Sequence, residues 1–398
     1  MKSWCKWNSG LSVKRSFYFL LVLILSGCKS ASDKDASGSI QKIILDSSQS
    51  KWGYDISPLL EQNIEVIKLE TASDCLFRAD GNAFFTEDRI FISDKTLKKV
   101  FMFDWNGKYL KSFGVVGRGP GEYIDLGDYF VKGDSLYIQD RLQDKIVVFP
   151  LDGGKQHEFY LDPPIYFNEF FELDDRFYFV TGYSNDYNLI RLNPTDGSRK
   201  YYLPYEPGID QKNQHWKLNK YISKYRDTVY LIYPRIDTIY KVFSNTVCPE
   251  YAVNFVHNKI PESLLNQTGT EILKTSIDQG YIVGLEKVCV SRDYILGYFG
   301  EGKKIQEFIY FKAKEESVIA ESLLLKNWGN LRALNYTVTD QDDFIFMYDA
   351  LSLKEAWQYI VSRNPFLKEE DREKLRSVTE SLQDEDNPVL FKCKLKKI

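Results

Sequence analysis

Eight side chains that could bind a ligand lie where the sequence predicts loops between strands. They combine carboxylates, guanidinium groups and a phenol, which together suit a polar organic ligand such as a sugar or a peptide. Carboxylates grouped at one opening could also hold Ca²⁺, a hard ion that takes about six to eight oxygen ligands. The alternative for each residue is that it caps a turn or ends a strand. The residues of this predicted ligand mouth are Asp94, Arg118, Glu122, Tyr123, Asp140, Arg141, Arg235 and Asp237.

The sequence gives little support for covalent catalysis or a transition-metal centre. Its three histidines, His157, His215 and His257, lie in stretches that are typical of surface loops. A Gly-x-Ser-x-Gly nucleophile turn does not occur in the sequence. We therefore expect no catalytic residue and no cofactor, with Ca²⁺ left open as an ion that the mouth could hold.

A glycine-rich segment, Gly117 to Gly121, has some likeness to a phosphate-binding loop. The position of the third glycine in a GxGxxG pattern is Glu122, and Pro120 lies inside the segment. The residues that follow do not begin a convincing helix, whose amides a phosphate cradle needs. We expect instead that the glycines supply unusual backbone angles where the chain crosses from one repeat to the next.

The elements that must position these residues recur along the chain. A unit of Asp, any residue and a short run of aromatic and β-branched residues appears six times. Such runs are typical of β-strands. The starts lie 46, 41, 52, 66 and 50 residues apart. The units begin at Asp88, Asp134, Asp175, Asp227, Asp293 and Asp343.

A further strand is predicted after each of the first five units, at residues 99–103, 145–149, 188–192, 238–243 and 307–311. In the first three units a tight turn comes next, namely Asn106-Gly107, Asp152-Gly153 and Asp196-Gly197. Because these dipeptides tolerate positive φ angles, they predict two-residue hairpin turns of type I′.

A period of about 40–50 residues with several short strands is typical of a β-propeller blade. We therefore predict an all-β fold, a six-bladed β-propeller over residues 61–398. The runs 64–69 and 389–395 are expected to share the last blade and close the ring, which leaves no free sheet edge. The 27 Tyr and 26 Phe residues would fill the gaps between twisted sheets.

Residues 352–385 interrupt the strand pattern. Apolar residues at helical spacing on either side of Asn364-Pro365 predict a helical hairpin inserted into the last blade. The hairpin is expected either to cap the side of the propeller or to act as a lid that docks a partner.

Four cysteines remain in the predicted domain: Cys75, Cys248, Cys289 and Cys393. They lie in apolar or alternating stretches, which favours buried free thiols. Disulfide pairing stays open, because the sequence cannot choose among the combinations.

The N-terminus has the features of a secretory signal. Lys2, Lys6, Lys14 and Arg15 precede the apolar run Phe17–Leu25, which is far shorter than the roughly 20 residues of a membrane-spanning helix. Residues 1–27 are therefore expected to be cleaved, and residues 28–60 to form a flexible tether. The chain has a net charge of −4 and offers no basic footprint for nucleic acid.

Two segments resemble known families. Leu25-Ser26-Gly27-Cys28 resembles the lipobox of bacterial lipoproteins, which implies that Cys28 is lipidated and anchors the protein in a membrane. Residues 100–123, which end in Gly117-Arg118-Gly119-Pro120-Gly121-Glu122-Tyr123, resemble NHL-type repeats. More closely, residues 62–150 resemble the six-bladed β-propeller lipoproteins of Gram-negative envelopes. Lys29 replaces the aspartate that favours inner-membrane retention, so we expect the outer membrane, on its periplasmic or its cell-surface side.

Two functions of different classes are consistent with these features. The first is a non-catalytic, lipid-anchored binding or scaffold protein that presents a propeller face to a glycan, a peptide or an envelope protein. The second is an enzyme in the axial channel, a metal-assisted hydrolase or a lyase, as in some NHL-like and lactonase propellers. Carboxylates that converge around an ion in the channel would favour the enzyme.

Overall fold

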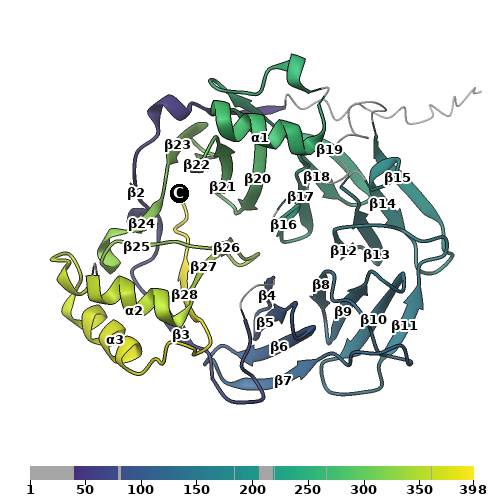
Figure 1. Cartoon of the computed structure of the whole chain (residues 1–398), viewed down its shortest axis with the longest axis horizontal. Helices are drawn as coiled ribbons and strands as arrows, with labels where there is room; N and C mark the ends of the chain where they lie inside the picture. The colour runs from purple at the N-terminus through teal and green to yellow at the C-terminus, as the bar shows by residue number, and fades with distance from the viewer. Residues whose placement is uncertain are drawn as a thin grey trace, which may run out of the picture. The chain divides into compact units, whose positions relative to one another are not determined.

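Residues 40–398 form a ring of seven small β-sheets (Figure 1). The computed structural model describes residues 40–78, 82–182, 184–205, 218, 220–265, 267–359 and 361–398. The predicted signal segment and Cys28 therefore lie outside the described residues. The predicted β-propeller is confirmed, but the predicted number of six blades is wrong, because the ring has seven sheets.

The first three blades have four strands each, and neighbouring strands within each blade are antiparallel. Blade one contains β4 (Ala83–Phe85), β5 (Arg89–Asp94), β6 (Lys99–Asp104) and β7 (Tyr109–Phe113). Blade two contains β8 (Tyr129–Lys132), β9 (Ser135–Asp140), β10 (Lys145–Pro150) and β11 (His157–Tyr160). Blade three contains β12 (Glu169–Leu173), β13 (Arg176–Val180), β14 (Tyr187–Leu192) and β15 (Arg199–Pro204).

The other four blades include strands from the N-terminal part of the chain or differ in size. Blade four contains β16 (Ile222–Tyr225), β17 (Thr228–Leu231), β18 (Thr238–Phe243), β19 (Thr246–Phe255) and β1 (Gln41–Leu45). Blade five contains β20 (Ile282–Val290), β21 (Tyr294–Glu301), β22 (Lys304–Phe311) and β23 (Glu316–Ala320). Blade six contains β24 (Leu323–Leu325), β25 (Leu331–Arg332) and β2 (Tyr54–Asp55). Blade seven contains β26 (Thr337–Val338), β27 (Asp343–Tyr348), β28 (Val389–Lys394) and β3 (Glu65–Lys68).

Blade six is the sheet that the repeat count missed. Its strands are only two or three residues long, so no Asp-initiated run marks it in the sequence. Two of its strands, β24 and β25, lie within the 50-residue interval between Asp293 and Asp343, which the sequence period counts as one repeat. β20 of blade five contacts β26 of blade seven directly, so blade six lies toward the outside of the ring (Figure 1).

The ring is closed by strands from both ends of the described chain. β3 pairs antiparallel with β28, and Val66 lies opposite Phe391. This pairing confirms the prediction that residues 64–69 and 389–395 share the last blade. Because each sheet is then flanked by two others, the broad faces of the blades are shielded from water.

Residues 40–60 form a belt along blades four to seven, which corrects the predicted tether. β1 runs parallel to β19 and β2 runs parallel to β24. Between them, Lys51 donates its backbone N–H to Ile319 of blade five over 3.2 Å. The stretch is ordered because its apolar side chains, Ile43 among them, are buried between sheets.

The predicted glycine turns are present, but their type differs from the prediction. Gly107 and Gly153 have φ angles of 81° and 94°. Each glycine N–H donates to the carbonyl three residues earlier, Asp104 or Pro150, at 3.0 and 3.1 Å. Only the glycine of each pair has positive φ, as in a type I turn followed by a left-handed glycine, rather than type I′.

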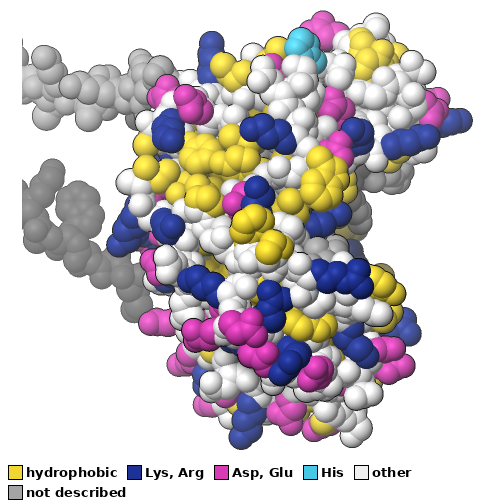
Figure 2. All heavy atoms as spheres, turned by 90° about the vertical axis from the view of Figure 1, so that its left-hand side faces the viewer, with side chains coloured by type: hydrophobic (Ala, Val, Ile, Leu, Met, Phe, Trp, Pro, Cys, Tyr) yellow, Lys and Arg dark blue, Asp and Glu magenta, His cyan; other side chains and the backbone are white. Residues whose placement is uncertain are grey.

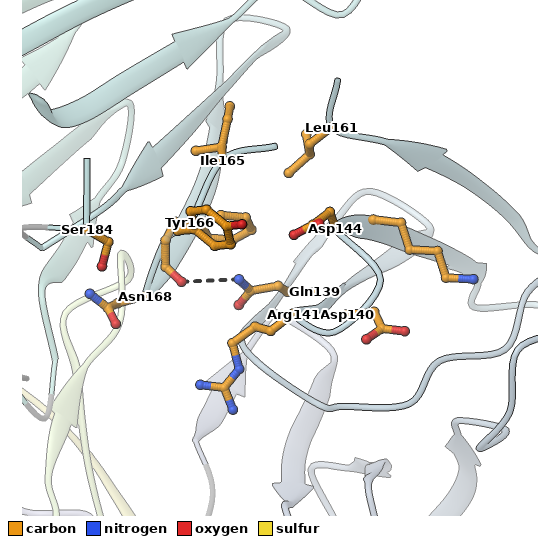
Figure 3. A pocket seen from close by; sticks show the side chains of 11 residues that line it. Gln139, Asp140, Arg141, Asp144, Leu161, Ile165, Tyr166, Asn168 and Ser184 are labelled. Atoms are coloured by element: carbon orange, nitrogen blue, oxygen red, sulfur yellow. Dashed lines mark hydrogen bonds between the residues drawn. The ribbon is translucent and has the colours of Figure 1, made fainter. Parts of the chain in front are cut away.

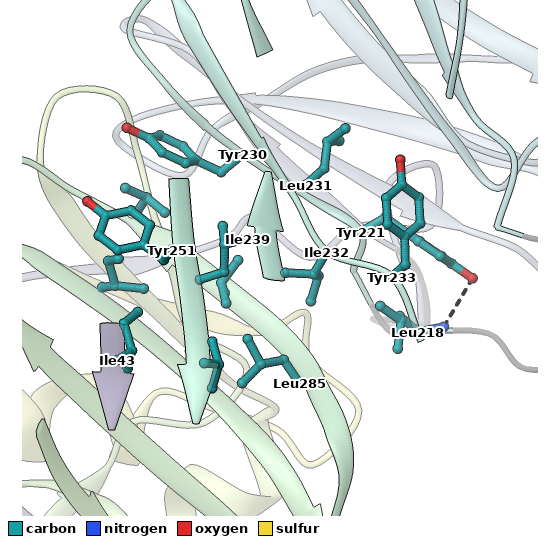
Figure 4. Close-up of a cluster of buried hydrophobic side chains, with 14 of the residues drawn as sticks. Ile43, Leu218, Tyr221, Tyr230, Leu231, Ile232, Tyr233, Ile239, Tyr251 and Leu285 are labelled. Atoms are coloured by element: carbon teal, nitrogen blue, oxygen red, sulfur yellow. Dashed lines mark hydrogen bonds between the residues drawn. The ribbon is translucent and has the colours of Figure 1, made fainter. Parts of the chain in front are cut away.

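One of the two large apolar clusters lies between blades three, four and five. In Figure 4, Ile43 of the belt lies near Ile239 and Tyr251 of blade four, while Leu285 comes from blade five. The described residues thus use aromatic and branched side chains from different blades to fill one core, as the high aromatic content predicts.

Three α-helices and five short 3₁₀ helices occur among the described residues. The α-helices are α1 (Gly269–Gln279), α2 (Ala350–Tyr359) and α3 (Glu369–Glu380). The 3₁₀ helices are η1 (Ser47–Gln49), η2 (Ser57–Leu59), η4 (Glu262–Leu264), η5 (Lys326–Trp328) and η6 (Val361–Arg363).

Helices α2 and α3 lie between β27 and β28, where the sequence predicts a helical insertion. Leu353 and Leu375 are buried in the cluster shared with blade six and blade seven. In the lower half of Figure 2, over this insertion, charged side chains of both signs cover the surface. The insertion therefore packs as a cap on the side of the ring. No helix of the described residues is long and apolar enough to span a membrane.

All four described cysteines are free thiols. Cys75, Cys289 and Cys393 are buried, as predicted, whereas Cys248 is only partly buried. Burial raises the pKa of the Cys75 and Cys393 thiols, so both stay protonated and unreactive.

We expect two adjacent isoleucines of the belt, Ile43 and Ile44, to contribute very differently to the free energy of unfolding. Ile43 is 0% exposed and Ile44 is 55% exposed. We expect Ile43→Ala to lower the free energy of unfolding by about 2–5 kcal/mol, because it leaves a cavity in the core. Ile44→Ala, the matched control, should change it by less than about 0.5 kcal/mol. Urea denaturation measures both values, and equal small effects would show that the belt does not contribute to the fold.

Candidate functional site

Two sets of connections lie on the same face of the ring. They are the turns between the second and third strands of blades one, two and three, and the crossings from one blade to the next. Antiparallel strands reverse direction at each turn, so these connections share one end of the sheets. We call this face the loop face. Its parts near the candidate residues are 70–78, 95–98, 114–128, 141–144 and 161–168.

Asp94 and Asp140 end the second strands of blades one and two, and both are almost fully buried. Asp94 accepts the backbone N–H groups of Arg78 at 2.8 Å and Leu97 at 2.6 Å. Asp140 accepts those of Ile124 at 2.9 Å and Leu142 at 3.1 Å. Each carboxylate thus links the turn that follows it to the crossing that enters the same blade. Their oxygens are engaged with the backbone and are poorly placed to bind a ligand.

The glycine-rich crossing is fixed by its own side chains. Glu122 accepts the N–H of Gly119 at 2.7 Å, inside the loop. Tyr123 is buried and donates its hydroxyl to the Lys98 carbonyl at 2.6 Å. Arg118 is exposed. This crossing is therefore a rigid link between blades one and two, and Arg118 is the candidate residue in it that faces solvent.

Arg141 is also exposed, and its Nε donates to Asp125 at 2.8 Å. Arg235 and Asp237 lie in the turn between the second and third strands of blade four, which is on the same face of the ring. Asp237 forms an ion pair with Lys259, and burial raises the pKa of its carboxyl. The structure therefore places all eight predicted residues at connections of the loop face, six of them on blades one and two, and Arg235 and Asp237 on blade four.

A hollow of about 260 Å³ opens on the loop face between blades two and three (Figure 3). Its floor is apolar, with Leu161, Ile165 and Phe167. Tyr166 lies at its rim and is 59% exposed, and Arg141 lies on the other side. Gln139 donates its amide to the Phe167 carbonyl at 3.2 Å, which fixes the base of the hollow. An apolar group could enter the floor while a carboxylate meets Arg141.

Exposed apolar side chains and exposed bases alternate along the loops that lead to this hollow. Each of four successive connections carries an apolar residue and a base within two positions of each other. The pairs are Leu76 with Arg78, Leu97 with Lys95, Val116 with Arg118, and Leu142 with Arg141. Singly exposed apolar residues are common, but here the pairing of an apolar residue with a base recurs on successive connections of one face. We therefore take the loop face as the candidate interaction surface.

A cluster of buried charged side chains lies at the inner ends of blades two and three. It is not among the sites predicted from the sequence. Asp128 accepts the backbone N–H of Phe170 at 3.1 Å, in the next blade. Glu169 accepts the N–H groups of Tyr221 and Ile222, each at 3.2 Å, in the blade after that. Lys220 contacts Glu169 at 3.3 Å. These carboxylates therefore connect the innermost strands of successive blades.

A signal for these two acids exists in the sequence. Each directly precedes two aromatic residues at the start of a first strand, as Asp128-Tyr129-Phe130 and Glu169-Phe170-Phe171. The Asp-initiated repeat marks only second strands, so it does not include these two acids at the first strands.

No group of three or more potential metal ligands among His, Cys, Asp and Glu occurs within the described ranges. Asp128 lies close enough to Glu169 for its charge to raise the pKa of Glu169, but both side chains accept backbone amides. This geometry offers a hydrogen-bonded carboxylate pair next to one lysine, without a third acidic ligand.

Burial raises the pKa of Glu169 to about 7, the Lys220 charge opposes this shift, and the Asp128 charge adds to it. The folded chain therefore holds a proton that the unfolded chain releases near pH 4.5. Because the folded state binds more protons in this range, the free energy of unfolding should fall as pH rises from about 4.5 to 7.

We expect Glu169→Gln to flatten this pH dependence, because glutamine does not ionise. Urea denaturation at pH 5, 6, 7 and 8 would measure the slope for the natural protein and the variant. The change in slope is the test, since the variant also loses hydrogen bonds and shifts in absolute stability. Parallel curves would mean that Glu169 has an ordinary pKa. Glu316→Gln, at an exposed position, is the control that should leave the slope unchanged.

The family model for a domain of unknown function, DUF4934, matches residues 53–394. An exported protein of Bacteroides fragilis has a TM-score of 0.70 at 20% identity, over 89% of this chain and 100% of that chain. A member of the DUF4221 family from Bacteroides vulgatus has a TM-score of 0.49 at 10% identity, over 85% and 98% of the two chains. The likeness to the B. fragilis protein, at 20% identity, shows a shared fold alone. No curated protein matches the chain. The family match extends from the second half of the belt to the last strand, and the chain belongs to the DUF4934 family.

Proposed function

We propose that this protein is a non-catalytic, lipid-anchored binding protein of the outer membrane whose loop face holds a polypeptide of the cell envelope. The observation that carries the proposal is the series of apolar and basic side chains that leads into the hollow between blades two and three. A partner with apolar and acidic side chains in alternation would match both features at once.

A polypeptide fits this surface better than a glycan does. Sugar rings usually rest on aromatic side chains, and Tyr166 is the aromatic residue that the hollow exposes among its described lining. Arg118 and Arg141 are planar guanidinium groups that pair well with carboxylates. The rigid crossings would also let the face bind without first being ordered, which favours affinity.

The N-terminal segment and the exported relative support a role in the cell envelope. The B. fragilis protein that shares this fold is described as exported. The lipobox-like segment ending at Cys28 suits a protein held at a membrane, where a partner in the same envelope is at high effective concentration.

Photocrosslinking in living cells would test the binding face. A photoreactive amino acid at Val116 or Leu142 should crosslink one envelope polypeptide, because both positions are exposed on the loop face. The same amino acid at Lys155, which is exposed beside the turn between the third and fourth strands of blade two, is the matched control and should give no such product.

Charge reversal separates specific binding from chance proximity. Arg118→Glu combined with Arg141→Glu should reduce the crosslinked product at least about tenfold, because the partner's carboxylates would then be repelled. A product that is equally strong in this variant, or at Lys155, would contradict the proposal.

The anchor can be tested separately. Cys28→Ala should move the protein from the membrane fraction to the soluble fraction after cell lysis, because the lipid attachment site is lost. The charge-reversed variant serves as control and should stay with the membrane. Membrane retention of Cys28→Ala would show that another feature holds the protein there.

A further inference from the structure

A second hollow lies at the seam where the first and last blades meet. Its volume is about 220 Å³, and its lining comes from blades one and seven. Its lining comes from the turns between first and second strands of both blades, from Trp105 in the turn between the third and fourth strands of blade one, and from the end of β28, so this hollow is on the face opposite to the loop face. We call it the seam groove. The polypeptide proposal does not involve it.

One wall of the seam groove is aromatic. Phe85 and Trp105 stack with ring centroids 5.9 Å apart and an interplanar angle of 23°. Trp105 donates its indole N–H to the Thr86 carbonyl at 3.2 Å, which fixes the orientation of the ring. Both rings are only partly buried. The wall is therefore a rigid apolar surface that is accessible from the groove.

Lys392 provides a hydrogen-bond donor that lies over the Trp105 part of this wall. Its ammonium lies 4.3 Å from the Trp105 ring centroid. The Glu65 carboxylate is 3.8 Å away, which is beyond hydrogen-bond distance. Lys394, by contrast, is held by Asp343 at 2.9 Å and by the Gln341 carbonyl at 2.7 Å. Lys392 thus keeps donor capacity for a ligand.

The opposite rim provides acceptors. Asp340 and Gln341 are exposed at the turn between β26 and β27 and line the groove. A carboxylate and an amide oxygen accept hydrogen bonds from hydroxyl groups. Glu87 adds another exposed acid, so the groove does not favour an anion.

From this combination we propose that the seam groove binds a neutral saccharide. The C–H face of a pyranose is weakly positive and packs on the negative face of an aromatic ring. In the seam groove it would meet the part of the Phe85 and Trp105 wall that the Lys392 ammonium leaves uncovered. Its hydroxyl edge would bond to Asp340, Gln341 and Lys392. A flat aromatic ligand would use the wall but leave these polar groups unsatisfied. The volume is below the range of about 300–1,000 Å³ for drug-sized ligands, which suits a single sugar ring.

Saturation-transfer NMR with the full-length protein would test the proposal. The probes are glucose, galactose, mannose and N-acetylglucosamine, with glucuronate as the charged comparison. At least one neutral sugar should receive saturation on its C–H face and show saturable binding, and glucuronate should bind more weakly. If none of the neutral sugars binds at about 50 mM, the proposal is wrong.

Variants test whether the sugar binds in the seam groove. Trp105→Ala should weaken it at least about tenfold, and Asp340→Asn and Gln341→Ala should each weaken it severalfold. The last two positions are exposed, so these variants keep the test valid if Trp105→Ala fails to fold. Trp52→Ala removes a 74% exposed tryptophan of the belt and is the matched control. Equal loss in Trp52→Ala, or full binding in Trp105→Ala and Asp340→Asn, would overturn the assignment.

Discussion

The whole structure depends on mutual burial between neighbouring sheets. A sheet of three or four short strands cannot shield both of its faces, so each blade is stable only with a neighbour on either side. The ring must therefore close. Closure here rests on β3 pairing with β28, which joins residues separated by more than three hundred positions in the chain. The belt extends the same principle, because it adds backbone pairing and buried side chains to blades four to seven.

This constraint also decides what the acidic residues do. At the outer turns, Asp94 and Asp140 hold the crossings against the blades. At the inner ends, Asp128 and Glu169 hold each first strand against the next. A carboxylate that accepts backbone N–H groups is a structural element, and its burial is compensated by those bonds. The side chains available to a ligand are therefore those that the connections expose, such as Arg118, Arg141 and Tyr166, and those that line the seam between the first and last blades.

Part of the fold was predictable because it rests on local patterns. The six Asp-initiated runs are the second strands of six blades, and the strands predicted after the first five are third strands. Alternating aromatic and β-branched residues mark these central strands, because both of their faces are buried. Blade six has no such run, since its strands of two or three residues depend on pairing with residues 54 and 55 from far away in the sequence. The site was predictable only as a set of loop positions. Which polar groups bond to the backbone and which face solvent depends on contacts between loops.

By itself, the sequence determined the all-β repeat architecture, the pairing of its two ends and the glycine positions, because each follows from residue types within a few positions or from a simple period. Only the tertiary structure decided the number of blades, the ordering of residues 40–60 and which polar residues of the predicted mouth bond to the backbone. The physical reason is that these features depend on burial between distant segments. Ile43 and Ile44 have the same side chain and adjacent positions, yet one fills the core and the other faces water, and only the packing of β1 on blade four separates them.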